Sequence, residues 1–408
     1  MITVLKAAKL IDGTGVAPIM NAALVVEDDQ IVQIGHASDI IIPAEARVID
    51  LGDCSLIPGM IDAHLHFVHS GNNYLEWLMT PVALQAIRAA TDAKALLEAG
   101  FTAVRSMGSP VDICLRDAVN EGTIPGPRIV ASGRAISQTR GHFDIHNIPA
   151  EWLKDGWCGL VADGADECRK AARTVLRDGA DVVKICTTGG GLSEKDDPSE
   201  AQFTVEEIKA ITDEAHRVGR KVASHACCPE GVKIAIQGGV DTIEHGFVLD
   251  RETCQMMVDA GTPLTSTLSV GEIVAAHGAE HGSPEHQLKK DRARIKGRFE
   301  SLKLAHDMGV KVALGTDFWG GGMLPFGNNA CEFDALVRAG LSNMDALAAG
   351  TSIAAEVLGM EDSIGTLEVG KLADVVAVYG DPLEDISVLQ QVHFVMKGGD
   401  VVVHKQED

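Results

Sequence analysis

The sequence has little positive charge and few aromatic side chains. Its 408 residues include 35 Lys and Arg against 58 Asp and Glu, a formal net charge of −23, and Phe, Trp and Tyr make up 4%. A surface of this sign repels phosphate backbones and anionic lipid. We therefore expect no nucleic-acid partner and no membrane partner, and a small molecule as the substrate.

Long apolar runs and cysteine motifs are missing as well. No stretch approaches the ~18 uncharged apolar residues of a membrane span. The N-terminal stretch, which Lys6 and Lys9 interrupt, lacks the apolar segment of a signal peptide. The nine cysteines contain no C-x-x-C pair, and only Cys227 and Cys228 are adjacent. Buried free thiols in a reducing compartment fit this pattern, so the sequence predicts a cytoplasmic protein.

Both ends of the chain alternate apolar and polar side chains with a period of two, which is typical of strands. The alternation runs through 1–56 and again through 365–404, where Gly398-Gly399 suits the positive φ of a tight hairpin turn. Chain termini are often close in space, so the two ends can pair with each other. We expect residues 1–56 and 361–408 to form a small discontinuous β-sandwich domain.

The middle of the chain, 57–360, alternates short β-branched runs with helix-length stretches that end in glycine. Eight such units in series predict a (β/α)8 TIM barrel, with a doubly wound open sheet as the alternative. Four longer segments, 68–100, 137–160, 187–203 and 269–298, are expected to be loops over one end of the barrel. The strand candidates are 55–67, 102–107, 128–136, 181–186, 221–226, 242–246, 263–268 and 311–317.

The ends of these strand candidates carry metal-binding or titratable side chains, where a barrel of this kind has its catalytic groups. Each signal is weak alone, because a single histidine in a buried strand is more often a hydrogen-bonded core residue. Residues i and i+2 of a strand share a face, however, so both histidines of the first strand would point into the barrel mouth. Neutral imidazoles with a carboxylate suit Zn²⁺ or a related ion. The candidate ligands are His64, His66, His225, His245 and Asp317.

Lys184 stands out because its strand candidate, 181–186, is otherwise apolar after Asp181. An ammonium held there would meet a large desolvation cost. The amine could reach the barrel end or pair with a carboxylate. Alternatively, a lowered pKa would leave a free amine that takes up CO2 as a carbamate, whose two oxygens could bridge two divalent ions. We favour the bridging carbamate.

The same segments resemble the amidohydrolase superfamily. The resemblance rests on PGMIDAHLH (58–66), VVKI (182–185), SHA (224–226), IEHG (243–246) and LGTD (314–317), with GTLEVGKLADVVAV (365–378) similar to the return strand of that family's β-sandwich. The resemblance covers nearly the whole chain and includes the order and the spacing of these motifs. Within the superfamily the chain is most similar to the branch of Xaa-Pro dipeptidases, zinc dipeptide carboxypeptidases and imidazolonepropionase-like proteins.

This resemblance implies a role for each residue. His64, His66 and Asp317 would hold one metal ion, His225 and His245 a second, and carboxylated Lys184 would bridge them together with a hydroxide that attacks the amide. Asp317 would pass the proton of this hydroxide to the leaving amine. His142 would hydrogen-bond the substrate carbonyl or the oxyanion, with His146 as a rival.

The chain departs from the pattern of relatives that cleave dipeptides. Those relatives commonly carry a Tyr or His two or three residues after the ligand of strand 5, where this chain has Cys227 and Cys228. A substrate carboxylate would then need another anchor, and Arg140 or His142 is our candidate, with Cys228 also predicted to contact the substrate. Trp77, Phe318 and Trp319 are further candidates for the pocket wall.

We expect a binuclear metal amide hydrolase, a dipeptidase or carboxypeptidase that acts on dipeptides or N-acyl amino acids and forms a homo-oligomer. Hydrolysis of aryl amides, ureas or carbamates is the alternative, as is a cyclic amide hydrolase of the imidazolonepropionase type. A mononuclear deaminase is disfavoured, because Lys184 is present and Cys228 occupies the acidic place of H-x-x-E. A non-enzymatic scaffold is disfavoured because the ligand set has no gap.

Overall fold

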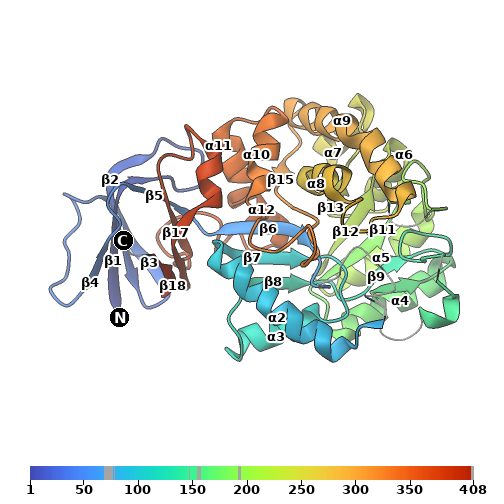
Figure 1. Ribbon diagram of the computed structural model, residues 1–408, viewed down its shortest axis with the longest axis horizontal. Coiled ribbons are helices and arrows are strands. Elements are labelled where there is room, and N and C mark those ends of the chain that lie inside the picture. The colour runs from blue at the N-terminus through green and yellow to red at the C-terminus, as the bar shows by residue number, and fades with distance from the viewer. Residues whose placement is uncertain (69–76, 78, 147, 154–157, 192–193, 406–408) are drawn as a thin grey trace.

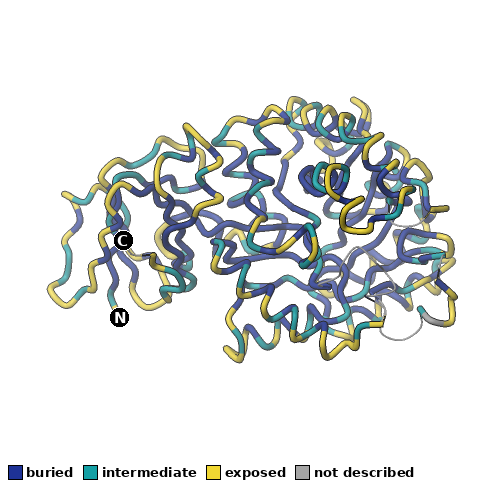
Figure 2. The backbone as a smooth tube through the Cα atoms, viewed as in Figure 1, coloured by how far each residue is buried: buried dark blue, intermediate teal, exposed yellow. Residues whose placement is uncertain are grey.

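The computed structural model describes the chain except for residues 69–76, 78, 147, 154–157, 192–193 and 406–408. It has two parts (Figure 1): a β-rich part that contains both ends of the chain, and a larger part in which helices surround parallel strands. Buried residues run through the middle of both parts, and exposed residues lie on the outer turns of the helices and loops (Figure 2).

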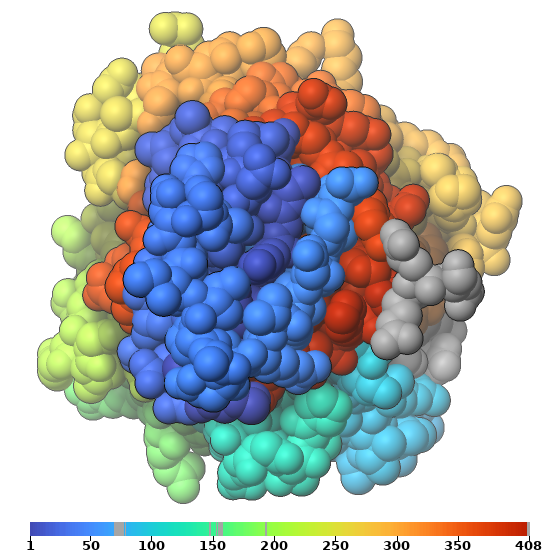
Figure 3. All heavy atoms as spheres, turned by 90° about the vertical axis from the view of Figure 1, so that its left-hand side faces the viewer, coloured from blue at the N-terminus to red at the C-terminus, as the bar shows by residue number. Residues whose placement is uncertain are grey.

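The β-rich part is one eight-stranded sheet built from both ends of the chain, in the order β18-β17-β16-β5-β1-β2-β3, with β4 pairing with β1. The antiparallel pairing of β5 with β16 joins the two ends, which lie side by side in Figures 1 and 3. Gly398 and Gly399 have φ of 53° and 80° in the last hairpin, as its turn requires. The strands are β1 (Ile2–Leu10), β2 (Ile19–Glu27), β3 (Gln30–His36), β4 (Arg47–Asp50), β5 (Cys54–Pro58), β16 (Val375–Tyr379), β17 (Val392–Lys397) and β18 (Asp400–His404).

The larger part has parallel strands, as the alternating pattern of the sequence predicts. They form a three-stranded sheet, β6-β7-β8, and a seven-stranded sheet, β10-β9-β11-β12-β13-β14-β15. The strands are β6 (Met60–Leu65), β7 (Phe101–Ser106), β8 (Arg128–Ala131), β9 (Ala135–Ser137), β10 (Gly159–Val161), β11 (Val182–Cys186), β12 (Lys221–Ala226), β13 (Thr242–His245), β14 (Leu264–Thr265) and β15 (Val312–Ala313).

Backbone hydrogen bonds also connect these two sheets. The N–H of Ala63 in β6 donates to the carbonyl of Leu314, just after β15, at 2.8 Å, and the N–H of Asp317 donates to the carbonyl of His64 at 2.7 Å. At the other edge the N–H of Asp181 donates to the carbonyl of Ala131 at the end of β8. The first and the last parallel strands are therefore neighbours.

The helices pack around the parallel strands, and several end as the sequence predicts. Gly179 and Gly261 close two of them with φ of 104° and 68°. Of the described residues, no helix is long and apolar enough to cross a membrane. The helices are α2 (Val82–Glu98), α3 (Asp112–Asn120), α4 (Gly164–Asp178), α5 (Val205–Arg217), α6 (Pro229–Gln237), α7 (Arg251–Ala260), α8 (Leu268–His277), α9 (Glu285–Asp307), α10 (Cys331–Arg338), α11 (Asn343–Ala349) and α12 (Ser352–Leu358), with 3-10 turns at Ala150–Trp152 and Ile386–Gln390.

Four of the predicted loops and strands need correction. Segment 269–298 is not a loop, because α8 and the first half of α9 occupy most of it, and α2 likewise fills much of 68–100. The predicted strand 128–136 is two strands, β8 and β9, separated at Gly133, whose φ is 62°. The last predicted strand, 311–317, is only β15 (Val312–Ala313), and Asp317 beyond it has a φ of 58°.

Candidate metal centre

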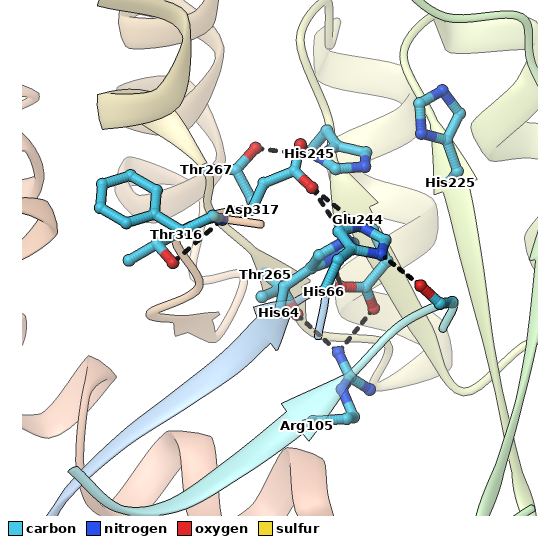
Figure 4. Close-up of polar contacts among 12 residues, drawn as sticks. His64, His66, Arg105, His225, Glu244, His245, Thr265, Thr267, Thr316 and Asp317 are labelled. Carbon is cyan, nitrogen blue, oxygen red and sulfur yellow. Dashed lines mark hydrogen bonds and ion pairs between the residues drawn. The ribbon is translucent and has the colours of Figure 1, made fainter. Parts of the chain in front are cut away.

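Two histidines at the end of β6 and one aspartate after β15 form a compact group of possible metal ligands. One ligand atom from each of His64, His66 and Asp317 lies within 4.8 Å of the others. The Nε2 atoms of His64 and His66 are 3.5 Å and 3.0 Å from Asp317 Oδ1. Figure 4 shows the three side chains pointing toward one another.

Each of these two histidines is held through its other ring nitrogen. Nδ1 of His64 donates to Glu244 Oε2 at 2.6 Å, and Nδ1 of His66 donates to the carbonyl of Gly108 at 3.0 Å. A carboxylate and a carbonyl can only accept, so a neutral ring keeps its lone pair on Nε2, toward Asp317. Two lone pairs and a carboxylate that face each other suit a cation between them.

His225 and His245 come from the ends of the neighbouring strands β12 and β13, and their ring centres are 4.6 Å apart. Nε2 of His225 donates to the carbonyl of Gly189 at 3.0 Å, and Nδ1 of His245 is 2.8 Å from Thr267 Oγ1. Burial holds the pKa of both rings well below the usual range, so both are neutral at neutral pH. The His245 ring lies 4.7 Å from that of His64.

Lys184 lies in β11 and lines the same pocket as these histidines. Its side chain is buried, and its Nζ has no hydrogen-bond partner in the part of the chain that the structure describes. Burial lowers the pKa of the amine. His64 Nε2 is also buried without a hydrogen-bond partner among the described residues, and burial lowers the pKa of His64 to about 4. The chain therefore leaves two basic nitrogens unpaired at the place where metal ions would bind.

Backbone strain is present at two of these residues. His245 and Asp317 have φ of 74° and 58°, a left-handed conformation that residues other than glycine rarely adopt. Such strain persists where the surrounding structure imposes it, often at functional sites. Here it turns both side chains from the strand ends toward His64.

A second polar cluster lies beneath the histidines. Nη2 of Arg105 donates to Glu244 Oε1 at 2.7 Å, and its Nε donates to the carbonyl of Ala63 at 2.7 Å. Thr242 and Thr265 complete the set, each 3.2 Å from the guanidinium. Burial opposes the charge of Glu244, but Arg105, His64 and Lys184 together outweigh it and lower the pKa of this carboxyl. Glu244 thus links the cluster to His64 (Figure 4).

His142 lies over the second pair of histidines, which supports it over His146. Its Nδ1 donates to Asp196 Oδ2 at 2.8 Å, and its ring stacks on that of His225 with centres 4.2 Å apart. A Cβ on Gly190 would come within 2.0 Å of this ring, so glycine is needed there. His146 instead accepts a hydrogen bond from the N–H of Lys195 and is not among the pocket residues described.

These residues surround a pocket of about 140 Å³ whose remaining wall is largely apolar. Trp77 and Trp319 line it as predicted, whereas Phe318 is fully buried elsewhere. The apolar lining is completed by Val68, Phe143, Cys158, Phe247, Val270 and Val274.

The structure does not bring Arg140 or Cys228 into the described lining of this pocket. The guanidinium of Arg140 is largely exposed and pairs with Glu200 at 3.1 Å. Cys228 is buried at the start of α6 instead. A role for either residue in substrate binding therefore has no support in this geometry.

Sequence reasoning missed the contribution of α9 and of Glu244. Gln287, Asp291 and Arg298 of α9 line the pocket. The sequence predicts a loop over 269–298, and these three side chains are not among the predicted site residues. Glu244 directly precedes the candidate ligand His245, and a carboxylate next to a ligand on a strand is the signal that could have found it.

The chain is similar to known hydrolases over nearly its whole length. A profile of the Amidohydrolase family matches residues 55–402. The chain is 35% identical to ochratoxinase of Aspergillus niger, over 98% of this chain and 86% of that protein. Among solved structures, it is similar to a prolidase complexed with N-methylphosphonate-L-proline (32% identity, TM-score 0.93, 99% of this chain and 100% of the other). A Xaa-Pro dipeptidase with bound methionine is also similar (36%, TM-score 0.88, 98% and 99%).

Proposed function

Because the chain belongs to the amidohydrolase family and is a C–N bond hydrolase, we propose that it cleaves dipeptides or N-acyl amino acids with two divalent metal ions. The observation that carries this proposal is the pair of buried, unpartnered nitrogens, His64 Nε2 and Lys184 Nζ, in one pocket with the carboxylate of Asp317. A buried donor or acceptor without a partner is rare in proteins, and a bound group supplies the missing partner.

The donor set fits zinc, which binds imidazole nitrogen and carboxylate oxygen. His64, His66 and Asp317 would hold one ion, His225 and His245 the other, and Lys184 would bridge them after it takes up CO2. The lowered pKa of Lys184 supports this step, because only the free amine reacts with CO2. The bound ions would lower the pKa of a water molecule and polarise the scissile carbonyl.

The side chains around this centre would handle protons and orient the substrate. Asp317 would accept a proton at a carboxylate oxygen and donate it to the leaving nitrogen. Asp196 orients the ring of His142 through Nδ1. His142 would stabilise the negative charge that develops on the substrate oxygen.

The comparisons support a substrate with an amino acid on the leaving side. One similar structure holds N-methylphosphonate-L-proline and another, a Xaa-Pro dipeptidase, holds methionine. Both ligands have the free carboxylate of an amino acid. The apolar wall formed by Trp77, Phe143 and Trp319 supports the second candidate, an aryl amide, urea or carbamate, whose bulk such a wall would accept.

The finer features of the architecture are part of the same proposal. The hydrogen bonds from β6 to the segment after β15, and from Asp181 to β8, support a closed (β/α)8 barrel over 57–360. The buried cluster inside the terminal sheet, with Leu5, Leu24 and Phe394, supports a β-sandwich from 1–56 and 361–408. We also retain the predicted cytoplasmic location and homo-oligomer.

Metal analysis and a substrate panel together test the function. We expect close to two zinc ions per chain in protein purified without chelator, and hydrolysis of dipeptides or N-acyl amino acids that chelation abolishes. Metal content near one ion, or higher kcat/KM for neutral aryl amides or carbamates than for every dipeptide in a broad panel, would contradict the corresponding part of the proposal.

A further inference from the structure

The wall of the pocket contributed by α9 has a buried arginine. Arg298 is 5% exposed and is the one arginine among the described lining residues. Its Nη2 donates to Asp291 Oδ1 at 2.6 Å, and its Cζ lies 3.7 Å from the centre of the Phe247 ring. An ion pair and a cation–π contact thus fix the plane of the guanidinium.

Most of the hydrogen-bonding capacity of this arginine is unused. Nε and Nη1 are buried and have no partner among the residues that the structure describes. These two atoms carry three of the five N–H donors of a guanidinium. Arginine does not lose its charge in proteins, so the missing partners cannot be explained by a neutral side chain. An acceptor is therefore missing at this wall.

The helix that faces Arg298 leaves room for its guanidinium. A Cβ on Gly271 in α8 would come within 1.8 Å of Nη1 and 2.7 Å of Cζ. Gly271 has no positive φ that would require glycine, so the close approach of Arg298 is what requires it. Gly271, Asp291 and Phe247 thus hold the guanidinium on three sides.

The separation between Arg298 and the candidate metal ligands matches the length of one amino-acid residue of a substrate. Arg298 stacks on Phe247, and the Phe247 ring centre is 5.3 Å from that of His245. In a dipeptide or an N-acyl amino acid, the carboxylate lies one residue beyond the scissile carbonyl, about 3.8 Å along the chain. A substrate carbonyl near His245 would therefore place its carboxylate toward this wall.

We propose that Arg298 binds the free carboxylate of the leaving amino acid and thereby selects substrates with a C-terminal carboxylate. This inference rests on the proposed amide hydrolysis and names its substrate class more closely. Asp291 and Phe247 orient the guanidinium, whose remaining N–H donors match the two oxygens of a carboxylate. Arg298 takes the place that Arg140 was predicted to fill.

The first test compares each N-acyl amino acid with its own C-terminal amide. We expect wild-type kcat/KM to be roughly 10–100-fold higher for the acid, because the amide leaves a buried cation unpaired. Arg298→Gln should reduce this preference to nearly one, because kcat/KM for the acid should fall to about the value for its amide. Arg294→Gln is the matched control: Arg294 lies one turn earlier on α9 and pairs with Asp197, outside the described pocket lining, so its substitution should keep the preference.

A binding measurement provides a readout independent of turnover. Calorimetry with the metal-free protein should detect the free product amino acid but not its amide, and Arg298→Gln should abolish this binding. Gly271→Ala keeps Arg298 but displaces it, so it should also lower the preference for the acid; it decides the question if Arg298→Gln fails to fold. Arg298→Lys keeps the positive charge but not the planar pair of N–H donors. Its preference for the acid should therefore lie between those of the wild type and Arg298→Gln.

The outcomes separate this inference from the proposed function. If the wild type cleaves acid and amide equally well, or if Arg298→Gln or Gly271→Ala keeps the preference, the role of Arg298 is refuted while amide hydrolysis stands. If the wild type cleaves no member of the panel, the proposed function fails first.

Discussion

Two buried polar clusters lie one above the other in the larger part of the molecule, and they differ in how far their atoms are paired. In the lower cluster, Arg105 donates to Glu244, to two threonines and to a backbone carbonyl. In the upper one, His64 Nε2 and Lys184 Nζ have no hydrogen-bond partner within the described part of the chain. The polar groups of the lower cluster find their partners within the folded chain, whereas those of the upper cluster need a bound group as a partner.

Glu244 connects the two clusters and shows why both exist. One carboxylate oxygen is held by Arg105, and the other fixes the His64 tautomer. A ligand whose ring is held in this way needs no reorganisation to bind a metal ion. The paired cluster therefore serves as the rigid support of the unpaired one. Substitutions in the lower cluster should accordingly reduce the stability of the protein, and substitutions in the upper cluster should reduce metal binding or turnover.

The largest effect is expected for Asp317→Asn in the upper cluster. The amide has the shape of the carboxylate and tolerates the positive φ of this residue, but it cannot carry the proton. We expect kcat to fall by ~10²–10⁴-fold, and further if metal is lost, with the melting temperature of the metal-free protein nearly unchanged. A variant that keeps a tenth of the wild-type kcat would make Asp317 a structural residue.

Lys184→Ala should remove the metal ions and the activity together. The alanine has no amine to take up CO2, so the proposed bridge cannot form. Addition of acetate or propionate should restore part of both, since a small carboxylate can occupy the bridging position. Metal content after desalting and kcat with and without carboxylate are the measurements, and Lys209→Ala on the exposed face of α5 is the control. Full metal content in Lys184→Ala would refute the bridge.

Arg105→Met tests the lower cluster. It leaves the Glu244 carboxylate buried without its cation, and breaking a buried ion pair from one side costs about 3–5 kcal/mol. We expect the free energy of unfolding of the metal-free protein to fall by that amount, as measured by denaturant titration. Thr265→Val removes a single hydrogen bond of the same cluster and should cost about 1 kcal/mol. Equal effects of the two substitutions would show that the ion pair adds nothing.

The sequence predicts the parallel α/β architecture, because period-two runs and glycine-terminated helices are local signals. It also predicts that His64, His66, His225, His245, Lys184 and Asp317 gather at the strand ends, and the structure brings all six to one pocket. Residues of α9 escaped prediction for a physical reason. The buried positions of this helix include Gln287, Asp291 and Arg298, so its buried face is partly polar and lacks an apolar period.

The substrate side of the pocket could not be predicted for a related reason. Arg140 follows β9 in the sequence and is close to His142, so proximity along the chain favoured it as an anchor. The structure turns its side chain toward Glu200, with a φ of 64° at Arg140 itself. Orientation of a loop side chain depends on such backbone angles and on partners far along the chain, which a sequence pattern does not reveal.

Glu332 provides the test with the smallest expected effect. It is a buried carboxylate that accepts hydrogen bonds but forms no ion pair among the residues that the structure describes. It accepts hydrogen bonds from the N–H groups of Leu268 and Ser269, each at 2.8 Å, and from Ser266 Oγ at 3.0 Å. It thereby caps the first turn of α8, whose own N-cap residue, Thr267, makes no capping hydrogen bond with its side chain. Burial raises its pKa from 4.5 to about 7, whereas Arg105 lowers that of Glu244.

This raised pKa fixes the sign of a pH effect on stability. The stabilisation from protonated Glu332 is fully present below the unfolded pKa of 4.5 and is lost as the pH rises through about 7. Relative to Glu332→Gln, which does not titrate, the wild type should lose up to about 3 kcal/mol of unfolding free energy between about pH 5 and pH 8. Melting temperatures of both proteins across this range are the measurement. A difference in melting temperature that stays constant with pH would mean that the hydrogen bonds to Glu332 offset the effect of burial on its pKa. The Glu332 carboxylate would then be stable in its charged form, like that of Glu244 beside Arg105.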